Sequence, residues 1–408
     1  MTMKRKLLVV SLLATVASLN NPSFATTQKT MNTSLPNALS KAILDEPDDL
    51  GSLSQDPKIQ AFLKKNDSLL SSHFPYRINL PKAGQVAKNN AGIRIAETAN
   101  QLASDTTGLL FYYKLLDHAM RVPHWHGNAT EIGIVLTGKM RITIWEGSGK
   151  PHVFTVEKNG TWTIPPGTLH CLENVENSPL TFIVGYDSPI TADRDFATAW
   201  ASLPDEMLEK ALGLTQADIA DIRKTTVNRL SKYDPANDKQ KTDSNSPFSG
   251  NFSKANSLFN SELGSIRRLD EKNVPKMTAM SLQQTILKPN AMRQPHWYLG
   301  ADTLLYVYKG TAFFTMMDND GTVYNVLIKP GDVVYIPMGV FHSYVNVGKE
   351  NLELYETFEG TKTVTEISLL EGSKNLNPQV LAGATGISQA TAQRLAKTKT
   401  VSPYIISL

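Results

Sequence analysis

The sequence contains a single cysteine, Cys171, so no disulfide can form within the chain. Cys171 directly follows His170, and neighbouring side chains of a β-strand face opposite sides of the sheet. If His170 points into a functional site, Cys171 therefore points away from it. We predict that Cys171 is a small residue packed in a sheet, rather than a thiolate ligand or nucleophile.

The sequence also lacks a strong excess of charge of either sign. It has 41 lysine and arginine residues against 38 aspartate and glutamate residues, and three of the positive charges, on Lys4, Arg5 and Lys6, lie at the extreme N-terminus. Without these three the balance is 38 to 38. Because nucleic acids and anionic membranes select basic surfaces, we expect neither as a partner.

Long apolar runs are missing as well, apart from one near the N-terminus. There the basic residues precede an apolar stretch from Leu7 to Ala17, and the small residues Ser23 and Ala25 follow it. This stretch is shorter than the roughly 20 residues of a membrane-spanning helix, and the pattern is typical of a cleavable secretory signal. We predict that residues 1–25 are a signal peptide cleaved near Ala25, and that the mature protein is secreted or periplasmic.

The most informative feature is an internal repeat. The stretch RVPHWHGNATEIGIVLTG, residues 121–138, matches RQPHWYLGADTLLYVYKG, residues 293–310, at a constant offset of 172 (296 minus 124). The same offset, without a gap, pairs Pro165, Gly167, His170, Asn174 and Val175 with Pro337, Gly339, His342, Asn346 and Val347. So many matches at one offset indicate a duplication.

Each copy consists of short β-rich runs separated by turn residues, and each is followed by a stretch with helical character. We therefore predict an all-β dominated protein with two tandem sandwiches or barrels, each followed by short helices. A polar run between the copies is predicted to be a linker. The predicted parts are an N-terminal extension at 26–74, a first domain at 75–233, the linker at 234–257 and a second domain at 258–408.

The first copy carries a candidate metal site. On a strand, His124 and His126 project from the same face, Glu131 can return to that face after the turn at Gly127, and His170 opens another strand after Pro165. Five of the only 8 histidines in the chain fall in the two matching frames, which argues against a chance cluster.

Three imidazoles and one carboxylate leave one or two coordination positions open, as in catalytic rather than structural metal sites. Nitrogen and oxygen ligands without thiolate favour manganese or iron, and they are also compatible with zinc, copper or nickel. We therefore predict a divalent transition metal held by His124, His126, Glu131 and His170.

The second copy has lost part of this set. His296 and His342 remain, but Tyr298 replaces the second histidine and Thr303 replaces the glutamate. Asp302 is one residue out of register and would face away on a regular strand. Two imidazoles without a carboxylate are a poor divalent site, so we expect the second copy to have kept its fold and lost its metal.

These motifs resemble the cupin family, and specifically the two-domain cupins that include oxalate decarboxylase. The first motif is HWH followed by Glu131 and Gly138, and the second runs from Pro165 to Asn174, although Asn159 and Gly160 stand where the family has Gly-Asp. The resemblance covers about residues 75 to 408. It implies two β-barrels of the double-stranded β-helix or jelly-roll type with a metal inside a barrel.

The resemblance also implies an activity. In oxalate decarboxylases an arginine at the position of Arg121 polarises the carboxylate substrate, and a lid residue, usually a glutamate, transfers the proton. No glutamate occurs between Glu176 and Glu206, so Asp193 is the nearest substitute. We expect a metal-dependent enzyme that converts oxalate, or a related small carboxylate, to formate and carbon dioxide. An oxalate oxidase and a non-catalytic metal-binding or small-molecule-binding protein are the alternatives, and relatives of this type often form trimers or hexamers.

Overall fold

The computed structural model describes residues 53–97, 102, 107–147, 149–224, 228–238, 240–360, 364–398 and 402–408. The predicted signal peptide and residues 26–52 of the predicted extension lie outside this part of the chain. Within the described residues, no helix combines the length and the apolar character that a bilayer crossing requires.

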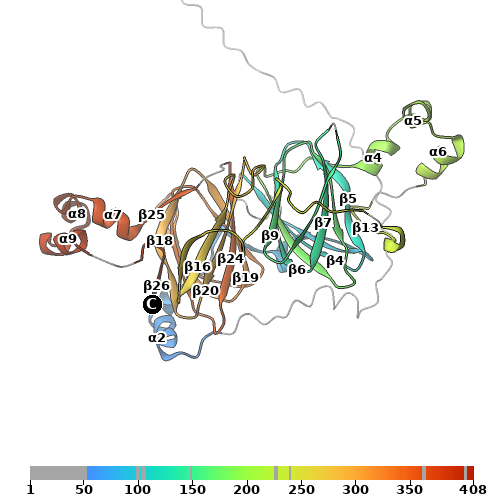
Figure 1. Cartoon of the computed structure of the whole chain (residues 1–408). Coiled ribbons are helices and arrows are strands. Elements are labelled where there is room, and N and C mark those ends of the chain that lie inside the picture. Colours follow the sequence, from blue (N-terminus) through green and yellow to red (C-terminus); the bar gives the residue numbers. More distant parts are fainter. Residues whose placement is uncertain are drawn as a thin grey trace, which may run out of the picture. The chain divides into compact units, whose positions relative to one another are not determined.

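The first copy folds as two antiparallel sheets (Figure 1). One sheet has the order β14 (Ser249–Asn251), β9 (Gly160–Ile164), β6 (Glu131–Thr137), β11 (Leu180–Tyr186), β4 (Leu109–Leu115), β3 (Gly92–Ala96) and β2 (Gln85–Asn89). The other has the order β12 (Asp193–Asp195), β5 (Ala119–His126), β10 (Leu169–Asn174), β7 (Lys139–Trp145) and β8 (His152–Glu157), with β13 (Leu230–Lys232) also paired to β5.

The second copy repeats this plan. Its first sheet has the order β1 (Arg77–Asn79), β22 (Asp332–Ile336), β19 (Asp302–Lys309), β24 (Leu352–Glu359), β17 (Ser281–Leu287), β16 (Gly264–Leu269) and β15 (Ser257–Ser261). Its second sheet has the order β21 (Val323–Ile328), β20 (Ala312–Met317), β23 (Phe341–Asn346), β18 (Ala291–Leu299) and β25 (Thr365–Ser368), with β26 (Ile405–Ser407) paired to β18.

Helices follow each copy where the sequence predicts them. The described helices are α2 (Pro57–Asn66), α3 (Leu80–Ala83), α4 (Phe196–Ala201), α5 (Asp205–Leu212), α6 (Gln216–Ile222), α7 (Leu369–Asn375), α8 (Pro378–Thr385) and α9 (Gln389–Ala396), with 3₁₀ turns η1 (Asp67–Leu69) and η2 (Pro235–Asn237). A capping box at Thr215 begins α6 and one at Ser368 begins α7.

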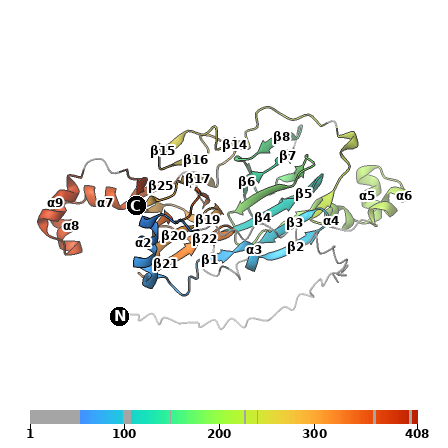
Figure 2. The same cartoon turned by 90° about the horizontal axis from the view of Figure 1, so that it is seen from below.

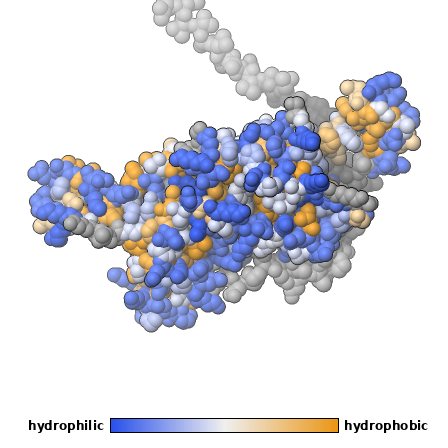
Figure 3. Space-filling model, in the orientation of Figure 1, coloured by the Kyte–Doolittle hydropathy of each residue, from blue (hydrophilic) through white to orange (hydrophobic). Residues whose placement is uncertain are grey.

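Apolar side chains are exposed on α5, among them Met207 and Leu212 (Figure 3).

The prediction of two tandem jelly rolls is confirmed. The sheets of each jelly roll lie face to face around an apolar core and are not joined into one closed hydrogen-bonded barrel. The core of the first includes Trp162 and Phe182, and the core of the second includes Phe314 and Tyr344, all of them buried. Strand β5 alternates between buried and more exposed side chains. Strands β6, β9 and β11 are instead buried almost throughout, as expected where both faces of a sheet are covered.

The two jelly rolls exchange one short strand each. Strand β1, which precedes the first copy, pairs with β22 of the second (Figure 2). Strand β14, which precedes the second copy, pairs with β9 of the first. The two strands are related by the same offset of 172 residues (249 minus 77). The stretch predicted to be a linker therefore supplies a strand of the first jelly roll, although the domain boundaries themselves remain a prediction.

Apolar contacts join the two copies as well. One buried cluster contains residues of the first jelly roll, such as Ile132 and Ile134, together with residues of the second, such as Leu304 and Tyr306. From the N-terminal segment, Ile59 of α2 packs on strands of the second copy. Burying a large aliphatic side chain contributes about 1.5–3 kcal/mol, so this shared cluster is a substantial part of the stability of the assembled chain.

Candidate metal centre

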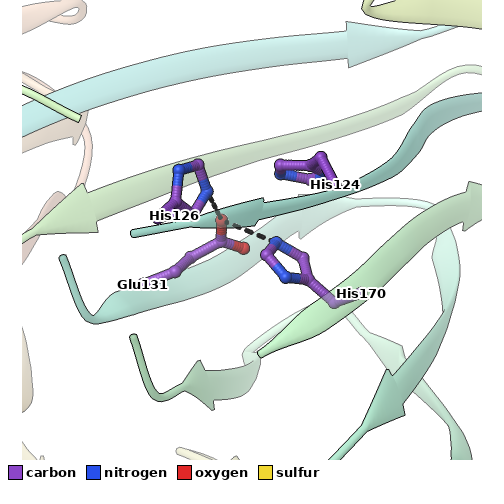
Figure 4. A group of neighbouring side chains, drawn as sticks. All are labelled: His124, His126, Glu131 and His170. Carbon is purple, nitrogen blue, oxygen red and sulfur yellow. Dashed lines mark hydrogen bonds and ion pairs between the residues drawn. The ribbon is translucent and has the colours of Figure 1, made fainter. Parts of the chain in front are cut away.

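Three strands of the first jelly roll bring the four predicted ligands together (Figure 4). His124 and His126 lie two residues apart on β5, Glu131 begins β6, and His170 lies on β10, where it is paired with His124. Their candidate ligand atoms all lie within 4.8 Å of one another. Among the described residues this is the one such group of histidine, cysteine, aspartate and glutamate side chains.

The imidazoles are oriented by hydrogen bonds at their outer nitrogens. Nδ1 of His124 lies 2.7 Å from the carbonyl oxygen of Val122, and Nδ1 of His170 lies 2.8 Å from that of Thr168. A carbonyl only accepts, so each Nδ1 carries the proton and each Nε2 keeps its lone pair. Nε2 of His170 is buried and lies 3.3 Å from Oε2 of Glu131, as expected of two donors of one metal site.

Glu131 is held in place by aromatic donors. The indole Nε1 of Trp162 donates to Oε1 of Glu131 at 2.8 Å, and the hydroxyl of Tyr186 donates to Oε2 at 3.3 Å. A Cβ on Gly133 would lie 2.1 Å from the Trp162 ring, so a glycine on β6 is what allows the indole to reach this carboxylate. The carboxylate oxygen Oε2 also lies 3.0 Å from Nε2 of His126.

Burial and charge act in opposite directions on this carboxylate. Burial alone would raise the pKa of Glu131, but the imidazoles of His170 and His126 lower it well below its usual range. Burial, together with the charge of Arg121, lowers the pKa of His124. An ionised carboxylate and a neutral imidazole are the forms that bind a divalent cation. The donor set thus fits a divalent transition metal.

Arg121 is buried beside the site but already has acidic partners. Its Nη1 lies 2.7 Å from Oδ1 of Asp195 and its Nη2 lies 3.3 Å from Oδ2 of Asp193, both on strand β12. Strand β12 pairs with β5, which places Asp193 opposite His126 and Asp195 opposite His124. The structure therefore brings Arg121 and Asp193 to the site, where the two side chains form an ion pair with each other.

Cys171 is buried, and its thiol lies 3.4 Å from the carbonyl oxygen of Arg121. Burial raises the pKa of this thiol, which keeps it protonated. It does not belong to the group of candidate ligands.

The cupin family pattern matches this chain twice, at residues 78–220 and 250–393. The chain belongs to the cupin family. It is 26% identical to an oxalate decarboxylase of Bacillus subtilis (strain 168) over 254 residues, which are 60% of this chain and 66% of that enzyme, just under two thirds of its length.

A solved cupin structure shares this fold, and another relative in sequence has a different role. A solved structure of the Bacillus subtilis oxalate decarboxylase, studied for its Mn(II) centres, is 19% identical and superimposes with a TM-score of 0.72 over 83% of this chain and 90% of that one. A 13S globulin seed storage protein of Fagopyrum esculentum is 28% identical over 145 residues, 34% of this chain and 25% of that protein. At these identities, similarity of fold does not decide the reaction.

The second domain of this cupin retains the frame of the site and two of its four candidate ligands. The Nδ1 atoms of His296 and His342 face backbone carbonyls as in the first domain, and both Nε2 atoms are buried without a hydrogen bond. Tyr298 and Thr303 occupy the positions of His126 and Glu131, and Asp302 instead accepts from the backbone N–H of Met338 at 2.8 Å.

A carboxylate that the repeat comparison does not reveal lies in the same interior. Glu356 on β24 is fully buried, and it accepts hydrogen bonds from the Tyr298 hydroxyl at 2.8 Å and from Nε2 of Gln283 at 2.7 Å. Burial raises its pKa. At the offset of 172 its counterpart in the first domain is Val184, so the acidic side chain occurs in one copy only. Tyr298 and Gln283 thus engage this carboxylate in place of a metal.

The buried histidines of the second domain predict a pH-dependent stability. Burial lowers the pKa of His342 to about 4, whereas in the unfolded chain it is about 6.5. Between these values the unfolded chain binds a proton that the folded chain does not, so stability is lost as the pH falls. We expect His342 alone to cost about 2 kcal/mol between pH 7 and pH 5.

Urea denaturation of the metal-free protein at the two pH values measures this loss. His342→Gln should show a loss smaller by about that amount, because glutamine does not titrate. Equal losses in the variant and the wild type would contradict the assignment. Because each protein is compared with itself, a general destabilisation by the substitution does not affect the result.

Several residues of the site carry no motif that sequence reasoning could use. Trp162 and Tyr186 hold Glu131, Asp195 holds Arg121, and Arg229 contacts Asp193. All four reach the site through strand pairing or loop closure. The repeat offset was the one sequence signal that could have identified these four residues. It does not identify them, because the second domain has different residues at the corresponding positions.

Proposed function

We propose that this cupin is an exported metal-dependent enzyme that converts oxalate to formate and carbon dioxide. One observation carries the proposal: a complete and buried set of three histidines and one glutamate lies beside a buried arginine in the first domain, while the second domain has lost that set. Export rests on the signal-like residues 1–25. The similarity to oxalate decarboxylases supports the reaction class.

In this proposal His124, His126, Glu131 and His170 would hold the metal, which would supply a Lewis acid to bind and polarise a carboxylate. Manganese is the metal we expect first, because the oxalate decarboxylase with the same fold has Mn(II) centres. Iron, zinc, copper and nickel fit the same donors.

Arg121 would bind and polarise the second carboxylate of the substrate. Its guanidinium offers a fork of donors that matches a carboxylate, and within the water-poor interior each hydrogen bond to developing negative charge is strong. The Nη donors now face Asp193 and Asp195, and Nε is buried without a hydrogen bond. Oxalate would therefore displace strand β12 from Arg121 or bind through Nε.

Asp193 would move the proton that the reaction requires. Burial raises the pKa of Asp193. The contact with His126 and the charges of Arg121 and Arg229 lower that pKa by more than burial raises it, so the carboxyl is ionised in this conformation. To accept a proton from the monoanion of oxalate it would first have to leave these contacts, which would bring its pKa back up, and it would then return that proton to the carbon of the product. The oxalate monoanion then yields one carbon dioxide and one formate, so that atoms, charge and electrons balance.

Product analysis tests this proposal. The mature protein loaded with Mn(II) should release formate and carbon dioxide in equal amounts from oxalate, with little peroxide. An oxidase would instead consume dioxygen and release two molecules of carbon dioxide and one of hydrogen peroxide. Binding of oxalate without turnover would favour a non-catalytic binding protein, a role for which the similarity to the seed storage globulin is the supporting observation.

A homo-oligomer, as a trimer or hexamer, remains part of the proposal. Its support is the exposure of apolar side chains on the helices that follow each domain, including Met207 and Leu212 on α5 and Leu376 and Val380 near α8. Light scattering of the purified protein would measure the mass of the particle.

A further inference from the structure

His126 differs from the other two histidines of the site in what its outer nitrogen faces. Nδ1 of His124 and Nδ1 of His170 face backbone carbonyls, whereas Nδ1 of His126 lies 2.6 Å from the carboxylate oxygen Oδ1 of Asp193. Both atoms are buried, and within the described residues this close contact is the one polar contact that either atom makes. The contact follows from the pairing of β12 with β5, which sets Asp193 directly opposite His126.

The other oxygen of Asp193 is held by two arginines. Nη1 of Arg229 lies 2.5 Å from Oδ2, and Nη2 of Arg121 lies 3.3 Å from the same atom. Arg229 is anchored in turn, because its carbonyl oxygen accepts a hydrogen bond from the backbone N–H of Val122 on β5 at 3.1 Å. One carboxylate therefore bridges an imidazole of the site and a partly exposed arginine next to β13.

The second domain serves as an internal comparison. There Glu366 of β25 stands opposite Tyr298 in the same register, and its Oε1 accepts from Nη2 of Arg293 at 2.6 Å. The pair of a buried arginine and a carboxylate thus accompanies the fold in both domains. The contact between carboxylate and imidazole occurs only in the domain with the complete set of donors, because Tyr298 has no ring nitrogen.

We propose that Asp193 positions His126 for metal binding and that Arg229 holds Asp193 in that place. A carboxylate at Nδ1 keeps the proton on that nitrogen, fixes the ring orientation and leaves the Nε2 lone pair directed towards Glu131 and His170. This role differs from the proton transfer expected of Asp193 from the resemblance, because it acts in the resting protein before any substrate binds. The inference rests on the proposed metal site.

Titration of the metal-free protein with Mn(II), followed by calorimetry or by the electron paramagnetic resonance of the free ion, tests the positioning role. We expect Asp193→Ala to weaken binding roughly 10–100-fold, the usual effect of removing such an outer partner. Asp193→Asn keeps an acceptor oxygen and should lose less. Arg229→Gln should weaken binding by a smaller factor, because that arginine is partly exposed and acts through Asp193.

Asp195→Asn is the matched control. Asp195 lies on the same strand and pairs with Arg121, so its loss should leave the Mn(II) dissociation constant within about twofold of the wild-type value. Asp193→Ala and Arg229→Gln proteins that bind Mn(II) as tightly as the wild type would overturn the inference and leave the proposed function intact. If Asp193→Ala fails to fold, the Mn(II) affinities of Asp193→Asn and Arg229→Gln test the inference instead. A wild-type protein that binds neither Mn(II) nor any of the iron, zinc, copper and nickel ions that fit the same donors would overturn the proposed function itself.

Discussion

His126→Ala is expected to reduce the bound divalent metal from about one equivalent per chain to nearly none. The substitution removes one of four donors and leaves Oδ1 of Asp193 buried without its imidazole partner. The remaining two imidazoles and one carboxylate lack the fourth donor, so the affinity for a divalent ion such as Mn(II) should fall far enough for dialysis to remove it. Metal analysis of the purified and dialysed proteins by atomic spectroscopy measures the effect.

Tyr298→Phe, at the matching position of the second domain, is the control for this result. It removes the hydroxyl that donates to Glu356 but no metal ligand, so metal content should be unchanged, with some loss of stability. A wild-type protein with two equivalents of metal per chain would contradict the conclusion that the second domain has lost its site. Retention of a full equivalent in His126→Ala would contradict the ligand set.

The second large effect concerns Arg121. Replacing this arginine with glutamine should lower kcat for oxalate by a factor on the order of a hundred or more, because the lost donors act on charge that develops in the transition state. Arg121→Lys keeps the charge but loses the fork, so it should recover only part of the rate. Rates are compared per bound metal, which separates catalysis from metal loss.

Arg293→Lys is the matched substitution in the second domain. Arg293 is as buried as Arg121 and pairs with Glu366, but no complete donor set lies beside it. Its replacement should lower stability and leave kcat per bound metal nearly unchanged. Equal losses in both lysine variants would show that the two arginines serve the fold rather than the reaction. If Arg121→Lys left the turnover of oxalate unchanged, the paired donors of the guanidinium would not be needed for the reaction.

The sequence by itself determined the duplication, the fold class and the membership of the candidate metal site. Ligands such as His124 and His126 obey the two-residue period of a strand, and the constant offset of 172 residues places them in a repeated frame. Both signals are local or periodic. They can be read from the sequence without knowing any contact between distant segments. For the same reason, Tyr298 and Thr303 could be recognised as positions where the second copy has lost a metal ligand.

Only the tertiary structure decided what surrounds those ligands. Three features depend on which strands become neighbours. They are the exchange of β1 and β14, the packing of the Trp162 ring against Gly133, and the contact between Asp193 and His126. Strand pairing is set by the burial of two opposed sheets, and not by the residues of either partner alone. The same reason explains Glu356. Its position on β24 has no acidic counterpart in the first copy, and only the packed interior brings it to Tyr298.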